Sequence, residues 1–253
     1  YYWWPRFATP DRNVNYDPEK YPERWRKFCD FTYNQIEELM SGYGRIDILW
    51  LDGGWVRPRE TINVNRDGWY NHNYNQDINM ARIVKMARSH QPGLIVVDRT
   101  VHGRYENYRT PEQHVPERAL DYPWETCMTL GRQWAWRPND KLKSWQQCVR
   151  TLVQVVGGDG NLLLNVGPMP DGRIEPRQVA ILKQIGKWLE KYGESIYNTR
   201  GGPFVRGTWG AATRRDNVIY VHVLDPKSLP LRLPPLGVPV VSAEILTLSL
   251  IHI

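Results

Sequence analysis

The fold is decided by the stretch Ile46-Asp47-Ile48-Leu49-Trp50-Leu51-Asp52-Gly53-Gly54-Trp55. Its apolar residues, followed by an acid and two glycines, predict a buried strand of a parallel sheet that ends in a tight turn. Catalytic side chains of parallel sheets and barrels lie where strands give way to loops, so Asp52 is a catalytic candidate by position. Trp50 and Trp55 beside this carboxylate fit a sugar pocket, where aromatic faces stack on C–H groups. The alternative is that Asp52 only caps the turn.

Around this strand, amphipathic helical segments alternate with short apolar segments. The patterns predict helices over residues 23–42, 78–89, 142–156 and 176–192, and buried strands over 46–51, 94–97, 123–128 and 161–168. Such alternation predicts a parallel sheet built from βα units, as a barrel or a doubly wound layer. A complete barrel takes about 250 residues. Because this pattern ends near Thr199, we expect only about half of a barrel here.

The pattern changes after Arg200. Residues 218–223 alternate between apolar and polar, and residues 240–250 predict one or two further strands separated from them by proline-rich turns. We therefore expect a barrel domain over residues 1–200 and the start of an antiparallel β domain, truncated, over residues 201–253.

Composition favours a polar, ring-shaped ligand. The chain has 12 Trp and 14 Tyr but only 4 Phe, and the first two combine an apolar face with a polar group. Its net charge of +6 comes from 33 basic and 27 acidic residues without a block of Lys or Arg. This spread indicates a solvated surface and argues against nucleic-acid binding.

Other classes of site lack a sequence signal. Three cysteines without CxxC spacing predict free thiols, and the scattered histidines predict no metal site. Phosphate-loop and serine-elbow motifs are absent, so no signal for phosphate binding or serine hydrolase chemistry competes. No run reaches the roughly 18 apolar residues of a membrane span. The start resembles no signal peptide, but we expect both ends to be truncated, which leaves the compartment open.

The acids that follow the predicted strands form a plausible catalytic set. Asp52, Glu112 and Glu125 would share one rim of a barrel with Arg99. Two carboxylates with an arginine and several tryptophans are what glycoside hydrolysis requires, one as nucleophile and the other as acid and then base.

Five motifs, in order, resemble the retaining alpha-L-fucosidase family of glycoside hydrolases, family 29. The match runs from Tyr1 to about Pro203, and its strongest part is the motif over residues 160–168. The motifs are Leu49-Trp50-Leu51-Asp52-Gly53 with Asp98-Arg99, Thr110-Pro111-Glu112-Gln113, Trp124-Glu125-Thr126-Cys127, Gly160-Asn161-Leu162-Leu163-Leu164-Asn165-Val166-Gly167-Pro168, and Gly193-Glu194-Ser195-Ile196-Tyr197.

The resemblance implies the C-terminal portion of a (β/α)8, TIM-like barrel followed by a partial antiparallel β-sandwich. It implies a retaining exo-alpha-L-fucosidase that acts on terminal fucosyl residues of glycans without a cofactor. By resemblance the protein is expected to be secreted, periplasmic or lysosomal, with no nucleic-acid partner and no membrane span. A homo-oligomer is one option for its assembly.

The resemblance also assigns site residues. Asp52 matches the nucleophile, Glu112 is our choice of acid/base with Glu125 second, and Arg99 matches an arginine that contacts the sugar. The two catalytic carboxyls of a retaining enzyme are expected about 5–5.5 Å apart. The remaining pocket candidates are the aromatic residues Tyr1, Tyr2, Trp50, Trp55 and Trp134.

The chain departs from the family in two places. Asp98 stands where the family usually has Asn, which alters the charge near the site. The family's early His-His-Asp type segment, which grips the fucose hydroxyls, has no counterpart. We therefore expect the polypeptide to be inactive or unstable alone, with exposed sheet edges and apolar faces.

Other readings of the same residues remain open. The chain could act on another sugar, or be a non-catalytic carbohydrate-binding module of the same fold. Glu125 could be a structural acid, Trp134 and Trp136 could be core residues, and Arg99 could serve only as an ion-pair partner. Asn161 and Asn165 fit a role in satisfying backbone groups at strand ends better than contact with sugar.

Overall fold

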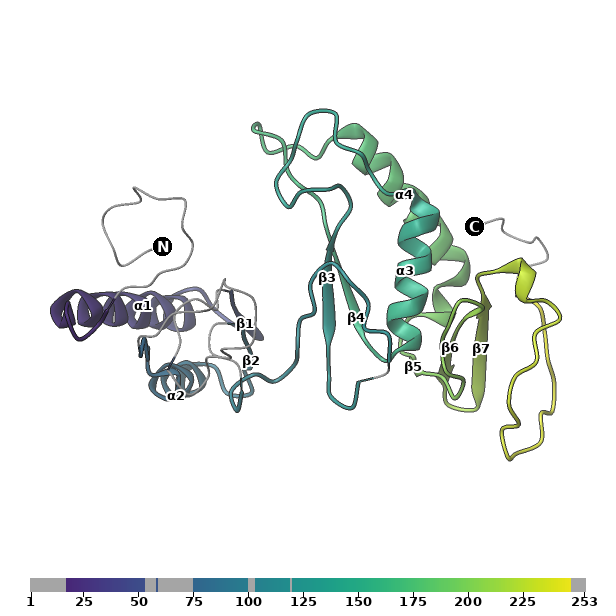
Figure 1. Ribbon diagram of the computed structural model, residues 1–253, viewed down its shortest axis with the longest axis horizontal. Coiled ribbons are helices and arrows are strands. Elements are labelled where there is room, and N and C mark those ends of the chain that lie inside the picture. The colour runs from purple at the N-terminus through teal and green to yellow at the C-terminus, as the bar shows by residue number, and fades with distance from the viewer. Residues whose placement is uncertain (1–16, 53–57, 59–74, 100–102, 119, 247–253) are drawn as a thin grey trace. The chain divides into compact units, whose positions relative to one another are not determined.

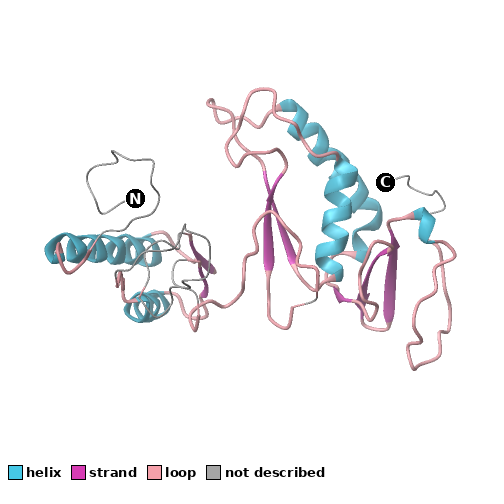
Figure 2. Cartoon of the chain, viewed as in Figure 1, coloured by secondary structure: helices cyan, strands magenta, loops and turns pink. Residues whose placement is uncertain are grey.

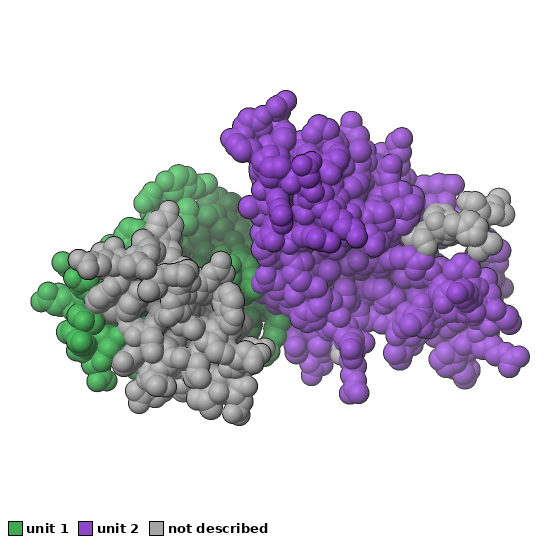
Figure 3. Space-filling view, turned by 45° about the horizontal axis from the view of Figure 1, so that its top comes forward, with its two compact units in different colours: residues 1–109 green, residues 110–253 purple. Residues whose placement is uncertain are grey.

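The computed structural model describes residues 17–52, 58, 75–99, 103–118 and 120–246. The chain divides into two compact units, Tyr1–Arg109 and Thr110–Ile253, which Figure 3 colours separately. This division lies elsewhere than the domain boundary predicted near Arg200, which stays a prediction.

Unit 1 contains two helix–strand repeats. Their elements are α1 (Pro22–Gly42), β1 (Ile48–Leu51), α2 (Met80–His90) and β2 (Ile95–Asp98). The strands pair in parallel, with Ile48 opposite Ile95 and Leu51 opposite Asp98 (Figure 1). The four residues of β1 pair one to one with the four residues of β2. Both strands therefore reach their carboxyl ends at the same edge of the sheet.

Side chains alternate between the two faces of this strand pair. Leu49 and Val96 are buried in a core that also contains Met40 and Ile83 of the helices. By contrast, Ile48 and Ile95 are 46% and 41% exposed. One face of the pair is therefore packed by α1 and α2, while Ile48 and Ile95 on the opposite face are accessible.

The side chain of Gln91 links the two repeats of unit 1 through backbone groups. The amide nitrogen of Gln91 donates to the carbonyl oxygens of Met40 and Gly44 at 2.6 and 2.8 Å. Its amide oxygen accepts from the Ile46 N–H at 3.2 Å. Gln91 thus satisfies backbone groups at the end of α1 and just before β1, which otherwise lack helix or sheet partners.

Unit 2 combines a parallel pair with an antiparallel sheet (Figure 2). Strand β3 pairs in parallel with β4, and β5, β6 and β7 follow in antiparallel order. The elements are β3 (Glu125–Thr129), α3 (Trp145–Gly157), β4 (Asn161–Asn165), α4 (Pro176–Tyr192), β5 (Arg200–Gly201), β6 (Gly210–Arg215) and β7 (Val218–Val223).

Helix α3 lies between the two sheets of unit 2 and contacts both β4 and β6. Val149 of α3, Trp188 of α4 and Ala211 of β6 belong to one buried cluster. At Gly157 an added Cβ would lie 2.5 Å from the Ala211 side chain, so only glycine allows this close approach. The antiparallel sheet is therefore packed directly onto the βα part of unit 2.

Most predicted elements are confirmed. Helix α4 and strand β7 have the predicted bounds, and the other helices and βα strands agree within three residues. The strand predicted over 240–250 is wrong for 240–246, which are not in a strand, and the rest lies outside the described residues. An apolar stretch becomes a strand only when a neighbour pairs with its backbone, and β7 pairs with β6 alone among the described residues.

Only about half of a barrel is expected, and the described part of the chain contains no closed barrel. The parallel strands form two separate pairs, β1 with β2 and β3 with β4. Among the described residues, no helix combines the length and apolar character that crossing a bilayer requires.

Candidate active site

Asp52 and Arg99 meet at the carboxyl edge of the β1–β2 pair. Each directly follows its strand, and the Arg99 N–H donates to the Leu51 carbonyl at 3.0 Å, which extends the ladder. Arg99 Nη1 lies 3.2 Å from Asp52 Oδ1. The arginine side chain is 18% exposed and the aspartate side chain 62%, so an anchored cation supports an accessible carboxylate.

Trp50 completes this group. It lies two residues before Asp52, and alternate residues of a strand share a face. The Arg99 guanidinium lies over the Trp50 ring, 4.9 Å from its centroid. The Trp50 indole Nε1 is buried and has no hydrogen-bond partner among the described residues. The structure thus brings together three predicted site residues: a carboxylate, a guanidinium and an aromatic ring.

In unit 2, Glu112 is held beside β3. The Cys127 N–H donates to the Pro111 carbonyl at 3.1 Å, and the Gln113 N–H donates to the Cys127 carbonyl at 2.9 Å. These bonds form a parallel bridge between Glu112 and Cys127. Glu112 is exposed, and its Oε1 accepts from the Trp134 indole N–H at 3.1 Å. The structure therefore also brings together the predicted residues Glu112 and Trp134.

Trp134 lies in the loop between β3 and α3, and β4 fixes its backbone. The Asn165 side-chain amide donates to the Trp134 carbonyl at 2.9 Å. The Asn165 carbonyl accepts from the Leu130 N–H at 2.9 Å, at the start of the same loop. Asn165 therefore satisfies backbone groups near a strand end, as predicted.

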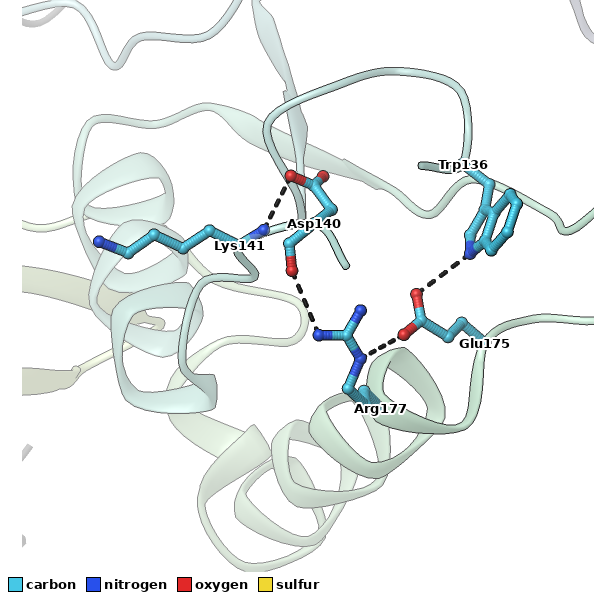
Figure 4. A network of polar contacts seen from close by, with 5 residues as sticks. All are labelled: Trp136, Asp140, Lys141, Glu175 and Arg177. Atoms are coloured by element: carbon cyan, nitrogen blue, oxygen red, sulfur yellow. Dashed lines mark hydrogen bonds and ion pairs between the residues drawn. The ribbon is translucent and has the colours of Figure 1, made fainter. Parts of the chain in front are cut away.

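A polar network fixes the other side of this loop (Figure 4). Trp136 Nε1 donates to Glu175 Oε2 at 3.2 Å, and Glu175 also accepts from Arg177. Arg177 Nη1 donates to the Asp140 carbonyl at 3.2 Å. The hydrogen bond from Arg177 lowers the pKa of Glu175. The ionised Glu175 therefore ties the loop to the first turn of α4.

Glu125 lies elsewhere. It is the first residue of β3, opposite Asn161 at the start of β4, and is half-buried. The loop that carries Trp134 follows the last residue of β3, at the opposite end of the strand. The parallel pair therefore separates Glu125 from the strand end where catalytic groups of such sheets are usually placed.

Not all predicted site residues can be placed together. Tyr1, Tyr2 and Trp55 lie outside the described residues. Asp52 and Arg99 belong to unit 1, whereas Glu112, Glu125 and Trp134 belong to unit 2. The expected short distance between the catalytic carboxyls therefore stays a prediction. Within the described residues, no cluster of three or more His, Cys, Asp or Glu side chains could hold a metal ion.

The sequence alone does not predict the bond between Trp134 and Glu112. The two residues are 22 positions apart and lie in loops without a periodic pattern. The one signal is the pair of tryptophans separated by a single alanine, Trp134-Ala135-Trp136, in a polar loop. Large aromatic side chains in an otherwise polar loop indicate that the loop makes tertiary contacts, but not with which residues.

Comparisons with known proteins point to one family. The sequence profile described as alpha-L-fucosidase matches residues 1–194. An alpha-L-fucosidase of Branchiostoma floridae is 30% identical over 206 residues, which cover 78% of this chain and 43% of that protein. Human tissue alpha-L-fucosidase is 30% identical over 174 residues, which cover 67% of this chain and 35% of that protein. The chain thus spans less than half the length of these relatives.

Solved structures agree with the sequence relatives. Alpha-L-fucosidase isoenzyme 1 from Paenibacillus thiaminolyticus matches with a TM-score of 0.68 and 29% identity, over 79% of this chain and 48% of that chain. A family 29 alpha-L-fucosidase from Bacteroides thetaiotaomicron, trapped as a covalent intermediate, matches with a TM-score of 0.66 and 25% identity. That match covers 84% of this chain and 52% of the other chain.

Proposed function

This chain belongs to the alpha-L-fucosidase family, and we propose that it forms the C-terminal part of the catalytic domain of a retaining exo-alpha-L-fucosidase. The observation that carries the proposal is the group of Asp52, Arg99 and Trp50 at one strand edge. It combines an accessible carboxylate with a cation and an aromatic face, as a glycosidase site requires.

Asp52 is the proposed nucleophile. Its carboxylate oxygen attacks the anomeric carbon of the fucosyl residue while the bond to the leaving oxygen breaks, and a glycosyl ester forms. Water then attacks the same carbon, the ester bond breaks, and fucose leaves with its original anomeric configuration. The covalent intermediate of the Bacteroides thetaiotaomicron relative, obtained with 2-fluoro-fucosyl fluoride, supports this two-step route.

Glu112 is the proposed acid/base. It gives its proton to the leaving oxygen in the first step and takes a proton from water in the second. Its exposed carboxyl and its contact with Trp134 support this choice. The place of Glu125 at the amino end of β3 favours a structural role for that residue. The trapped intermediate of the relative was obtained in a glutamate-to-glutamine variant, which is consistent with a glutamate in this role.

Arg99, Trp50 and Trp134 are the proposed sugar contacts among the described residues, and Tyr1, Tyr2 and Trp55 complete the set. An aromatic face covers C–H groups of the fucose ring and its methyl group, while a guanidinium donates to hydroxyl oxygens. We expect these contacts to favour a sugar with one apolar side. A panel of aryl glycosides measures that specificity and separates it from activity on another sugar.

The test replaces two aspartates at opposite ends of β1 in the protein expressed from its complete gene. Asp52→Ala is expected to lower kcat/KM for an aryl alpha-L-fucoside by about 10⁴-fold or more, with partial recovery of kcat in azide. Asp47→Ala is the matched control, because Asp47 pairs with Arg45 at the surface. We expect this control to keep nearly full activity.

Two outcomes would overturn the proposal. One is wild-type protein that hydrolyses no aryl fucoside, which would favour a carbohydrate-binding module. The other is Asp52→Ala protein that retains a tenth or more of the activity. In addition, NMR of the first product formed must show alpha-L-fucose, because two displacements at one carbon restore its configuration.

A further inference from the structure

We propose that Trp134 and Asn165 position Glu112 for proton transfer, with Trp134 acting through its indole N–H and Asn165 acting through Trp134. This inference rests on the proposed function and assigns two positioning residues to it. It attributes to Trp134 a role separate from any stacking against sugar.

The contacts form a continuous path from a strand to the acid. Asn165 is the last residue of β4, and its amide holds the Trp134 carbonyl at 2.9 Å. The Trp134 indole then reaches Glu112 Oε1 at 3.1 Å. A strand is more rigid than a loop. The contacts through Trp134 and Asn165 therefore link the position of Glu112 to β4, although Glu112 itself lies outside the regular strands.

The indole donor of Trp134 gives the exposed carboxyl of Glu112 a defined orientation. The Glu112 side chain is exposed and has three rotatable bonds, each with several accessible rotamers. The backbone bridge to Cys127 fixes only the main chain of Glu112. A donor on a side chain with two rotatable bonds selects one carboxyl orientation at small entropic cost. A carboxyl displaced by 1 Å loses much of its efficiency in proton transfer.

The neutral indole also suits a group that changes charge. An N–H donor can bond to a carboxylate oxygen and to the carbonyl oxygen of the protonated acid. The contact therefore persists when Glu112 gives up its proton and when it takes one back. A guanidinium in the same place would favour only the ionised form.

Trp136 provides an internal comparison. Its indole also donates to a glutamate, Glu175, but that glutamate is paired with Arg177 and lies at the start of α4. The Trp136 contact thus anchors the loop, whereas the Trp134 contact reaches the proposed acid. Substitution of either tryptophan by phenylalanine removes one indole N–H and the same atoms from the same loop. The two variants therefore form a matched pair.

The experiment compares Trp134→Phe with Trp136→Phe in the protein expressed from its complete gene. The substrates are two fucosides, one with an acidic phenol as leaving group and one with an unactivated alcohol. Acid assistance matters most for the unactivated alcohol, whereas stacking on fucose affects both substrates equally. Trp134→Phe is expected to lower kcat/KM about tenfold for the alcohol substrate and less than threefold for the phenol substrate.

The other variants define the limits. Trp136→Phe is expected either to leave kcat/KM unchanged or to lower it by the same factor for the alcohol substrate and the phenol substrate. Asn165→Ala is expected to lower kcat/KM more for the alcohol substrate than for the phenol substrate, as Trp134→Phe does. The ratio of the two losses is expected to be smaller, about threefold, because one neutral hydrogen bond is lost. Glu112→Gln shows the largest preference for the phenol substrate and provides the reference pattern.

Equal losses on both substrates in Trp134→Phe would overturn the inference, because they would indicate a role in sugar contact or folding alone. The same holds if Trp136→Phe and Trp134→Phe give the same substrate pattern. Failure of the proposed function looks different: wild-type protein is then inactive on both fucosides, or Glu112→Gln shows no leaving-group dependence.

Discussion

The two proposed catalytic carboxylates are held in different ways. Asp52 extends directly from a strand and is paired with a guanidinium, whereas Glu112 lies in a loop and accepts from an indole. A nucleophile must attack as an anion, which an adjacent cation favours, and it acts at one fixed carbon. An acid/base must exist in both protonation states, which a neutral donor tolerates. The support of each group therefore matches the chemistry proposed for it.

The strongest challenge to this comparison is a pair of glutamine variants. Glu112→Gln is expected to lower kcat/KM for an unactivated fucoside by about 10²- to 10⁴-fold, because proton donation is lost. Glu125→Gln is expected to change it less than threefold, in keeping with a structural position. Steady-state kinetics on the expressed protein measures both. A larger loss in Glu125→Gln would reverse the assignment of the acid/base.

A second pair of variants isolates the cation beside Asp52. Arg99→Met keeps the length of the side chain but removes its charge, and kcat/KM is expected to fall by about 10- to 100-fold. Arg45→Met removes a guanidinium from the exposed pair with Asp47 at the other end of β1, and little change is expected. If the arginine variants behave alike, the pair of Asp52 and Arg99 is no more than a surface contact.

A third prediction concerns the packing that holds the loop of Trp134. An added Cβ at Gly167 would lie 2.3 Å from the Trp136 backbone nitrogen, whereas nothing lies within 4 Å at Gly186. Gly167→Ala is therefore expected to lower the free energy of unfolding by about 2 kcal/mol. Gly186→Ala, inside α4, is expected to raise it by about 0.5–1 kcal/mol.

Denaturant unfolding of the two glycine variants measures these changes. Activity is measured as well, because a displaced loop disturbs the contact of Trp134 with Glu112. Gly167→Ala should therefore lose more activity on the alcohol substrate than on the phenol substrate. A stable Gly167→Ala protein with wild-type kinetics would show that the loop does not depend on this packing.

A last prediction concerns the stability of unit 2 in acid. Burial lowers the pKa of His222 in β7 to about 4, below its ordinary value of 6.5. Between pH 6.5 and pH 4 the unfolded state binds a proton at His222 and the folded state does not. The contribution of His222 to the free energy of unfolding is therefore fully present above pH 6.5 and is lost as the pH falls toward 4. Between pH 7 and pH 5 the loss is expected to be about 1–2 kcal/mol.

His222→Gln is expected to reduce this dependence while keeping a polar partner near Thr213 Oγ1, which lies 3.4 Å from His222 Nε2. Melting temperatures of wild type and variant at pH 7 and pH 5 give the comparison. If the two proteins lose the same stability in acid, His222 is not the group responsible.

Sequence patterns predicted the local elements of this chain well. Periodicity, a proline in the first turn and a terminal glycine located α4 at its observed bounds. The place of Asp52 and Arg99 after neighbouring strands followed from parallel pairing, in which the register puts both strand ends at one edge. Local signals were sufficient for each helix and strand because its residues are close together in sequence, and parallel pairing then placed the two strand ends together.

Features that depend on partners were not predictable. Residues 240–246 have a strand-like pattern but no described strand pairs with them, and propensity alone does not form a ladder. The contact of Trp134 with Glu112 joins two segments, and the path of the Trp134 loop is set by Asn165, Glu175 and Arg177. Such paths depend on tertiary contacts that leave no periodic trace in the sequence.

The bonds of Gln91 also bear on the order in which this protein forms during synthesis. The turn between α1 and β1 is completed by a side chain 45 residues beyond Ile46. A nascent chain that has emerged only as far as β1 therefore still lacks the amide that satisfies its turn. The first repeat must wait for the second, and both are expected to become resistant to protease together on the ribosome.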